Sequence, residues 1–252
     1  DPMGLSEDTH QPGSIFLPAL QHLALAGLGP LPSFAHALVL PSLTSLSITS
    51  HYYDMPVDET IATLLIKSYG HQLQEVILNY GSLSPSAFES CLQALPYVTC
   101  LSLICDTRFD NSTGEPTIGE DGTISWGPIR PFSAKVLRTM TPSSIDGTCY
   151  CPKLKVFRCA PNGWDFDDVD LMEFIAGRRR SNHDVARLRS VIVRFPFSKT
   201  FDMDKRLRDD GVDIDGLDLR IGYSPDSDFN AYPASNNLVA YIFDPLEDLL
   251  SI

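Results

Sequence analysis

The chain of 252 residues is long enough for one large domain, two small ones or one elongated repeat domain. Hydrophobic residues make up 43% of it and charged residues only 20%, which excludes a wholly disordered chain. The net charge of −13 argues against a general nucleic-acid binder and against docking on anionic membranes, since both need a surplus of Lys and Arg.

The sequence contains no apolar run long enough to cross a membrane, and its start, Asp1–Gly4, lacks the basic and apolar regions of a signal peptide. No two cysteines are spaced as a CxxC pair, and a chain of this size does not depend on disulfides. We therefore expect reduced thiols and a cytoplasmic or nuclear location. The thiols are those of Cys91, Cys100, Cys105, Cys149, Cys151 and Cys159.

A short phrase, apolar-x-x-apolar-x-apolar, recurs along the chain. It is found at Leu20/Leu23/Leu25, Leu43/Leu46/Ile48, Leu73/Val76/Leu78, Val98/Leu101/Leu103, Leu154/Phe157/Cys159, Leu188/Val191/Val193 and Ile214/Leu217/Leu219. The first positions of successive copies are 23, 30, 25, 56, 34 and 26 residues apart. These spacings lie near the leucine-rich-repeat period of roughly 20–29 residues, with longer excursions, and the spacing of 56 leaves open a degenerate repeat or an inserted loop.

The last two apolar positions of each copy predict a short strand with one buried face. A single strand of this kind cannot bury its face alone, so the copies must stack. We therefore predict an α/β fold: a leucine-rich-repeat solenoid with parallel strands on the concave face and helices and loops on the convex face. Its buried ladder is expected to contain Leu23, Leu46, Val76, Leu101, Phe157, Val191 and Leu217.

The segments between the strands have helical character. The clearest is Asp165–Arg180, with acids early and arginines late, as the helix dipole favours. The others are Val57–Tyr69, Pro85–Ala94 after Ser84, Phe132–Met140 and Phe201–Asp209. We expect an N-terminal segment over 1–16, which either is native throughout or includes residues added by a cloning vector. The repeat domain would then cover 17–229, with an inserted loop at about 106–131, and residues 230–252 would form a C-terminal cap or tail.

The LPxLxxLxL phrases and the stretches CPKLKVFRC, DLMEFIAGRRR, LRSVIVRF and LDLRIGY together resemble the C-terminal repeat region of fungal F-box proteins of the basidiomycete type. The resemblance covers most of Leu17–Tyr223. It implies a repeat domain that selects substrates for a cullin–RING ubiquitin ligase. The Skp-type adaptor would be bound only through an F-box, which this chain lacks.

No sequence pattern indicates a catalytic, metal or cofactor site. The acids at Asp165–Asp170 are better explained by helix capping than by calcium. The stretch Gly211–Gly216 lacks the first acid and the twelfth-position Glu of an EF-hand. No HExxH, GxSxG, Walker-type or GxGxxG motif occurs, so we expect no enzyme.

Residues that flank the buried positions of each strand point to the open side of the sheet. The last three copies place Arg158, Arg194 and Arg220 there, with Lys155 and Arg189 close by. In a chain of net charge −13 these cations predict either pairing with the chain's own acids or a site for an acidic or phosphorylated protein segment. Aromatic residues at strand ends are further candidates for protein binding, because Tyr and Trp are enriched at binding hot spots. They include Tyr52, Tyr80, Trp164 and Phe195. The alternative, which we favour for some of them, is that they fill the edge of the solenoid.

These observations favour a protein-recognition module, the substrate-binding part of an F-box-type ubiquitin ligase. The alternative is a stand-alone leucine-rich-repeat scaffold or inhibitor without a ligase link, and an enzyme is the least favoured class. An F-box in the complete gene product would separate the first two.

Overall fold

The computed structural model describes residues 14–26, 32–49, 60–105, 117–118, 124–125, 132–143, 149–161, 165–180 and 184–223. The fold is α/β, and its main element is a parallel sheet of seven strands in the order β11-β10-β9-β6-β5-β4-β2. The strands are β2 (His22–Leu25), β4 (Ser45–Ile48), β5 (Glu75–Asn79), β6 (Cys100–Ile104), β9 (Val156–Ala160), β10 (Ser190–Phe195) and β11 (Asp218–Tyr223).

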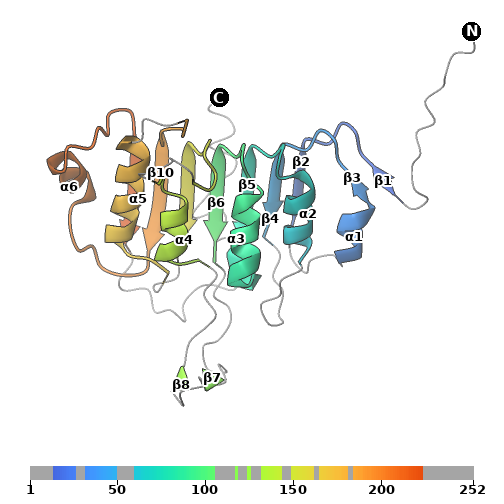
Figure 1. The fold of residues 1–252 in the computed structure, drawn as a ribbon, viewed down its shortest axis with the longest axis horizontal. Coiled ribbons are helices and arrows are strands. Elements are labelled where there is room, and N and C mark those ends of the chain that lie inside the picture. Colours follow the sequence, from blue (N-terminus) through green and yellow to red (C-terminus); the bar gives the residue numbers. More distant parts are fainter. Residues whose placement is uncertain are drawn as a thin grey trace, which may run out of the picture.

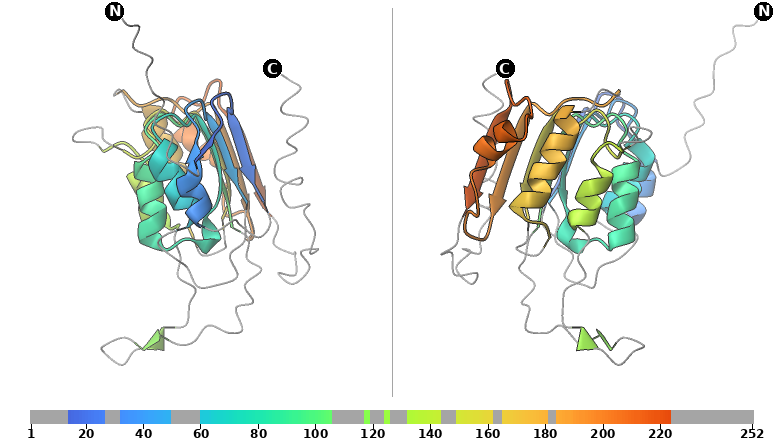
Figure 2. Two further views of the ribbon diagram at one scale, coloured as in Figure 1. Left: turned by 90° about the vertical axis from the view of Figure 1, so that its right-hand side faces the viewer. Right: turned by 60° about the vertical axis from the view of Figure 1, so that its left-hand side comes forward.

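All the described α-helices lie on one face of this sheet, as Figures 1 and 2 show. They are α1 (Pro32–Ala37), α2 (Ile61–Tyr69), α3 (Pro85–Gln93), α4 (Ala134–Thr139), α5 (Asp168–Arg180) and α6 (Met203–Asp209), with a short 3-10 turn η1 at Tyr80–Ser82. Neighbouring helices contact one another in chain order, and α3 and α4 are joined by the Lys135–Glu89 ion pair. The result is two layers, with the core between the sheet and the helices.

Local sequence explains where several helices begin. The Ser84 side chain accepts a hydrogen bond from Ala87 N, and Pro85 fills the first helical position, where no amide hydrogen is needed. Thr60 and Thr63 form a reciprocal capping box at the start of α2. The five predicted helical segments are confirmed as helices, and their observed ends differ from the predicted ones by a few residues. Helix α1 was not predicted.

The strands pair in one consistent register, and this confirms the predicted ladder at every position except one. Leu46, Val76, Leu101, Phe157 and Val191 are adjacent in turn and fully buried, and Leu23 extends the row at the partly buried edge. On β11, however, the partner of Val191 is Leu219 and not Leu217. The assignment of Leu217 was wrong because alternation defines which face a strand residue occupies but not its row in the ladder.

No strand of the main sheet lies between β6 and β9 within the 56-residue spacing, because these two strands pair directly with each other. Within this spacing, β7 (Thr117–Ile118) and β8 (Ile124–Ser125) form an antiparallel pair that lies away from the sheet (Figure 1). The spacing therefore reflects inserted chain. Most of the predicted loop 106–131 lies outside the described residues.

A second small parallel pair joins β1 (Ile15–Phe16) to β3 (Leu38–Val39) beyond the β2 end of the sheet (Figure 1). From the sequence, Ile15 and Phe16 are expected to lie in a separate N-terminal segment, but both residues pair with β3 in the fold.

Strands β4, β5, β6, β9 and β10 enter the sheet through the same backbone contact, and β11 makes it with the single amide of Asp218. One carbonyl of the preceding strand segment accepts hydrogen bonds from two successive amides of the next. The acceptors are Gln21, Thr44, Gln74, Thr99 and Lys155. Thr44 and Thr99 add their hydroxyls to the same carbonyls. The copies are thus equivalent in backbone geometry as well as in sequence.

We predict that Leu46→Ala or Leu101→Ala lowers the free energy of unfolding by about 2–5 kcal/mol, because each leaves a cavity in the fully buried ladder. Chemical denaturation measures the loss. Leu17→Ala is the matched control, since Leu17 is 39% exposed, and it should cost much less. Equal losses at the buried and exposed positions would contradict the register.

We predict that Gly70→Ala destabilises the chain by roughly 1–3 kcal/mol through overpacking. A Cβ atom at Gly70 would lie 2.1 Å from the carbonyl oxygen of Ala94, which is backbone and cannot rotate away. Gly222→Ala is the control, because its Cβ would meet only the Arg194 side chain at 3.5 Å. Thermal unfolding of both variants tests this; a melting temperature unchanged by Gly70→Ala would refute it.

Candidate protein-binding surface

The sheet face opposite the helices, here called the open face, is covered by no described helix or strand (Figure 2). Its residues are the outward positions of the seven strands, which alternate with the buried ladder. Towards β2 these positions are small and polar, including Ser45, Ser47 and Ser102. Ser45 donates to the Glu75 carboxylate on the next strand at 3.1 Å. The cations lie on β9, β10 and β11.

The register places two of the predicted arginines in one row. Arg158 on β9 pairs with Ile192 on β10, and Ile192 pairs with Arg220 on β11. Arg194 lies on the next row and pairs with Gly222. The structure thus brings Arg158, Arg194 and Arg220 to one region of the open face, with Ile192 between them. We call these four residues the arginine face.

One acidic residue occupies an outward position on these three strands. The Arg220 Nε donates to the Asp218 carboxylate at 2.9 Å. Both side chains are largely exposed, at 69% and 46%, so this ion pair adds little stability. The outward positions of these strands thus hold three arginines and one aspartate, in a chain whose net charge is −13.

A hollow of about 490 Å³ opens at the same place. Arg194, Arg220, Ile192 and Gly222 contribute to its lining. Gly222 lacks a side chain beside the stem of Arg194, and this leaves room at the edge of the sheet. The hollow therefore combines an apolar floor with guanidinium groups.

Lys155 and Arg189 lie one residue before the starts of β9 and β10. By the alternation of side chains along a strand, they lie on the side of the buried ladder and not on the side of the arginine face. The Lys155 carbonyl accepts the amides of Arg189 and Ser190, so these residues belong to the strand-entry contact. The structure does not bring them into the arginine face.

Two of the aromatic candidates are core residues and not surface anchors. Tyr80 and Phe195 are both fully buried, so neither can contact a partner. Their positions at strand ends did not reveal that the rings of Phe88 and Phe132 pack on Tyr80 and that the ring of Phe166 packs on Phe195. Tyr52 and Trp164 lie outside the described residues.

The buried rings form a continuous chain through the core. Tyr80 contacts Phe132, Phe132 contacts Phe166, and Phe166 contacts Phe195, with centroids 5.2–5.7 Å apart in edge-on geometry. Phe195 then stacks on Phe197 at 4.6 Å. Edge-on and offset pairs of this kind are favourable, and here they connect consecutive repeats.

Arg178 is the most unusual buried residue. It is 0% exposed, and its guanidinium donates to the carbonyls of Met140, Leu154, Tyr150 and Cys151, at 2.8–3.4 Å. Burial lowers its pKa from the usual value. The guanidinium thus joins the end of α4 and the turn before β9 to α5.

Arg179 joins α5 to the following repeat in the same way. It is 5% exposed and donates to the carbonyls of Leu188, Asp213 and Asp215. From the sequence, the arginines at the end of this helix are expected to complement the helix dipole. Their main contacts are instead with carbonyls of neighbouring repeats, which a local sequence pattern cannot show.

The acidic run before and within α5 divides into two roles. Asp167 and Asp170 exchange side-chain to backbone hydrogen bonds, as the capping prediction required. Asp165 instead accepts from the buried Tyr80 hydroxyl, and burial, with the nearby thiols and Asp165, raises the pKa of Tyr80 well above its usual value. Asp168 accepts from the Thr200 hydroxyl at 2.7 Å. Among the described residues, no three His, Cys, Asp or Glu side chains are grouped to hold a metal ion.

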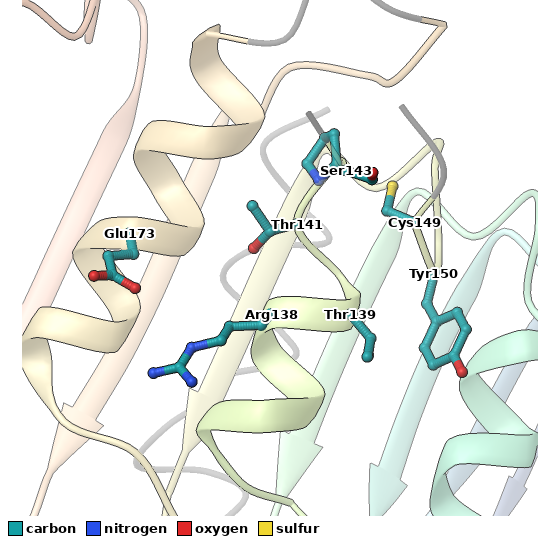
Figure 3. Close-up of a pocket in the computed structure, with 8 residues that line it drawn as sticks. Arg138, Thr139, Thr141, Ser143, Cys149, Tyr150 and Glu173 are labelled. Carbon is teal, nitrogen blue, oxygen red and sulfur yellow. The ribbon is translucent and has the colours of Figure 1, made fainter. Parts of the chain in front are cut away.

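A second hollow, of about 550 Å³, lies on the helical side between α4 and α5 (Figure 3). Figure 3 shows Arg138 on α4 directed towards α5, where it pairs with Asp170 at 3.2 Å. Cys149 borders the hollow, but burial raises the pKa of its thiol and so makes it a poorer nucleophile. This hollow offers no activated nucleophile and no pair of a base with its orienting group.

Comparison of the chain with protein-family models, with curated proteins and with solved structures finds no match. Among the described residues, none of the helices is both long and apolar enough to cross a membrane.

We predict that Arg178→Met lowers the free energy of unfolding by about 3–5 kcal/mol, because it leaves several buried carbonyls without a donor. Arg138→Met removes the same kind of side chain from an exposed ion pair, where Arg138 is 68% exposed, and should cost at most about 1 kcal/mol. Urea denaturation compares the two. Similar losses would show that Arg178 does not join the repeats.

We predict that the buried thiols resist alkylation in the native chain at pH 8. Burial raises the pKa of Cys91 and Cys151 from 9.0 to about 12, so neither forms the reactive thiolate there. The half-buried Cys149 should be labelled earlier. Because the folded pKa exceeds the unfolded one, the stability that these thiols contribute is complete below about pH 9 and is lost as pH rises towards 12. Mass spectrometry of iodoacetamide-treated chain measures the order of labelling, and early modification of Cys91 or Cys151 would contradict it.

Proposed function

We propose that this chain is a leucine-rich-repeat module that recognises a protein partner through its open face, and that it is the substrate-binding part of an F-box-type ubiquitin ligase subunit. The arginine face is the observation that carries the recognition proposal. It gathers cations around an apolar residue and beside a hollow, although the chain has a net charge of −13.

The repeat assignment is supported by the equivalence of successive copies. They share the buried ladder and a common strand-entry contact, and all the described helices lie on one side of the sheet. Such repeats contact only their neighbours along the row and leave an extended surface for binding. The ligase assignment rests on the sequence resemblance to fungal F-box proteins. It carries with it a cytoplasmic or nuclear location and adaptor binding through an F-box outside this chain.

A direct test of recognition compares two matched pairs of substitutions in the tagged chain. Ile77→Glu with Ile192→Glu places charge on the open face, and Val169→Glu with Met172→Glu places the same charge on α5. We expect proteins that co-purify with the parent chain in stoichiometric amounts to be lost from the open-face variant and kept by the α5 variant. Loss from both variants, or from the α5 variant alone, would overturn the proposed surface.

The ligase link has its own test. The gene product that contains this chain should carry an F-box and should bind a purified Skp-type adaptor with one-to-one stoichiometry, measured by light scattering. A gene product that recognises its partner through the open face but neither has an F-box nor binds the adaptor would instead be a stand-alone scaffold or inhibitor.

A further inference from the structure

We infer that the β2 end of the repeat stack is an interface between two copies of this chain. Four apolar side chains of the first repeat form this end, and we call them the end face: Ile15, Leu17, Leu20 and Leu23. They lie on β1, on β2 and between these strands, and β2 is the last strand of the seven-stranded sheet (Figure 1). The inference concerns a surface other than the open face and does not depend on the proposed function.

Each residue of the end face has a counterpart in the next repeat that is buried. The counterparts are Leu38, Leu40, Leu43 and Leu46. None of these is more than 5% exposed, whereas Ile15 and Leu17 are 41% and 39% exposed and the other two residues of the end face are half-buried. The end face therefore presents the surface that joins one repeat to the next, with no described repeat on its outer side.

The sequence around the end face carries no formal charge. Residues 9–53 contain no Asp, Glu, Lys or Arg, although these types make up 20% of the chain. At the opposite end of the stack, all residues of α6 except Met203 and Leu207 are charged. Charged side chains at the ends of a sheet prevent edge-to-edge association, and the cores of interfaces are depleted of them. The end face thus has the composition of an interface core and not of a protected edge.

A second copy of the chain is the partner that this composition fits. A two-fold interface places the same patch on both partners, so the patch must be complementary to itself. An apolar face without charge meets this requirement, whereas a charged face would meet its own charge. Each copy has a net charge of −13, so two copies can approach closely only where acids are absent. Strands β9, β10 and β11 lie at the other end of the sheet, so the dimer leaves that part of the open face accessible.

Light scattering by the full chain tests the inference. We expect the mass to rise with concentration from 27.8 kDa to twice this value by roughly 100 μM. Ile15→Glu/Leu17→Glu should raise the dissociation constant of the dimer at least about tenfold, because the two-fold axis brings the new charges of both copies together. The matched control, Tyr97→Glu/Val169→Glu, adds the same charge at positions that are 57% and 45% exposed and should change it less than about twofold.

Two further measurements separate loss of the interface from loss of the fold, which circular dichroism monitors in every variant. Ile15→Lys/Leu17→Lys should also be monomeric, and mixing it with Ile15→Glu/Leu17→Glu should restore a dimer, since opposite charges then face each other. In the parent chain, hydrogen exchange of the β1 and β2 amides should slow as the concentration rises, while exchange of the β11 amides should not change.

Four results would overturn the inference. The first is a parent chain that remains at 27.8 kDa at this concentration, and if that monomer binds another protein through the end face, the partner is that protein and not a second copy. The second is a dimer that the Glu variant keeps, or that this variant and its control lose equally. The third is failure of the folded Glu and Lys variants to associate on mixing. The fourth is hydrogen exchange that concentration slows at β11 and not at β1 and β2.

Discussion

The structure depends on one constraint, that no strand can bury its apolar side without the strand beside it. Each strand has about five residues, and its inward side chains become buried only when equivalent side chains lie on both sides. The fully buried row from Leu46 to Val191 satisfies this requirement, and Leu23 at the edge is only partly buried. The parallel register, the helical layer and the open face all follow from this stacking.

Polar contacts at the ends of the ladder fix the relative position of the repeats. Backbone amides of one repeat bind a carbonyl of the one before, and Arg178 and Arg179 reach in opposite directions from α5 to do the same with side chains. A buried guanidinium is costly unless its donors are satisfied, so these residues specify geometry more than they add stability. The arrangement holds β9, β10 and β11, which carry the arginine face, in a fixed register.

The two faces of the sheet have different roles, and this explains why the described residues include few candidate catalytic groups. The helical side uses its charged groups internally, as Asp165 does with Tyr80 and Asp168 does with Thr200. The open face has no described helix or strand packed on it. A surface of this kind can vary in sequence without loss of the fold, and recognition is the role for which it is suited.

The sequence by itself determined the repeating strands, their buried faces and the existence of the main helices, because periodicity and capping are local properties of the chain. It also determined that Arg158, Arg194 and Arg220 share the open face, since alternation fixes the side on which each residue lies. Only the tertiary structure decided the row of each residue, so Leu219 and not Leu217 completes the ladder. It also decided the burial of Tyr80 and Phe195 and the hydrogen-bond partners of Arg178 and Asp165, because the contacting segments are distant in sequence.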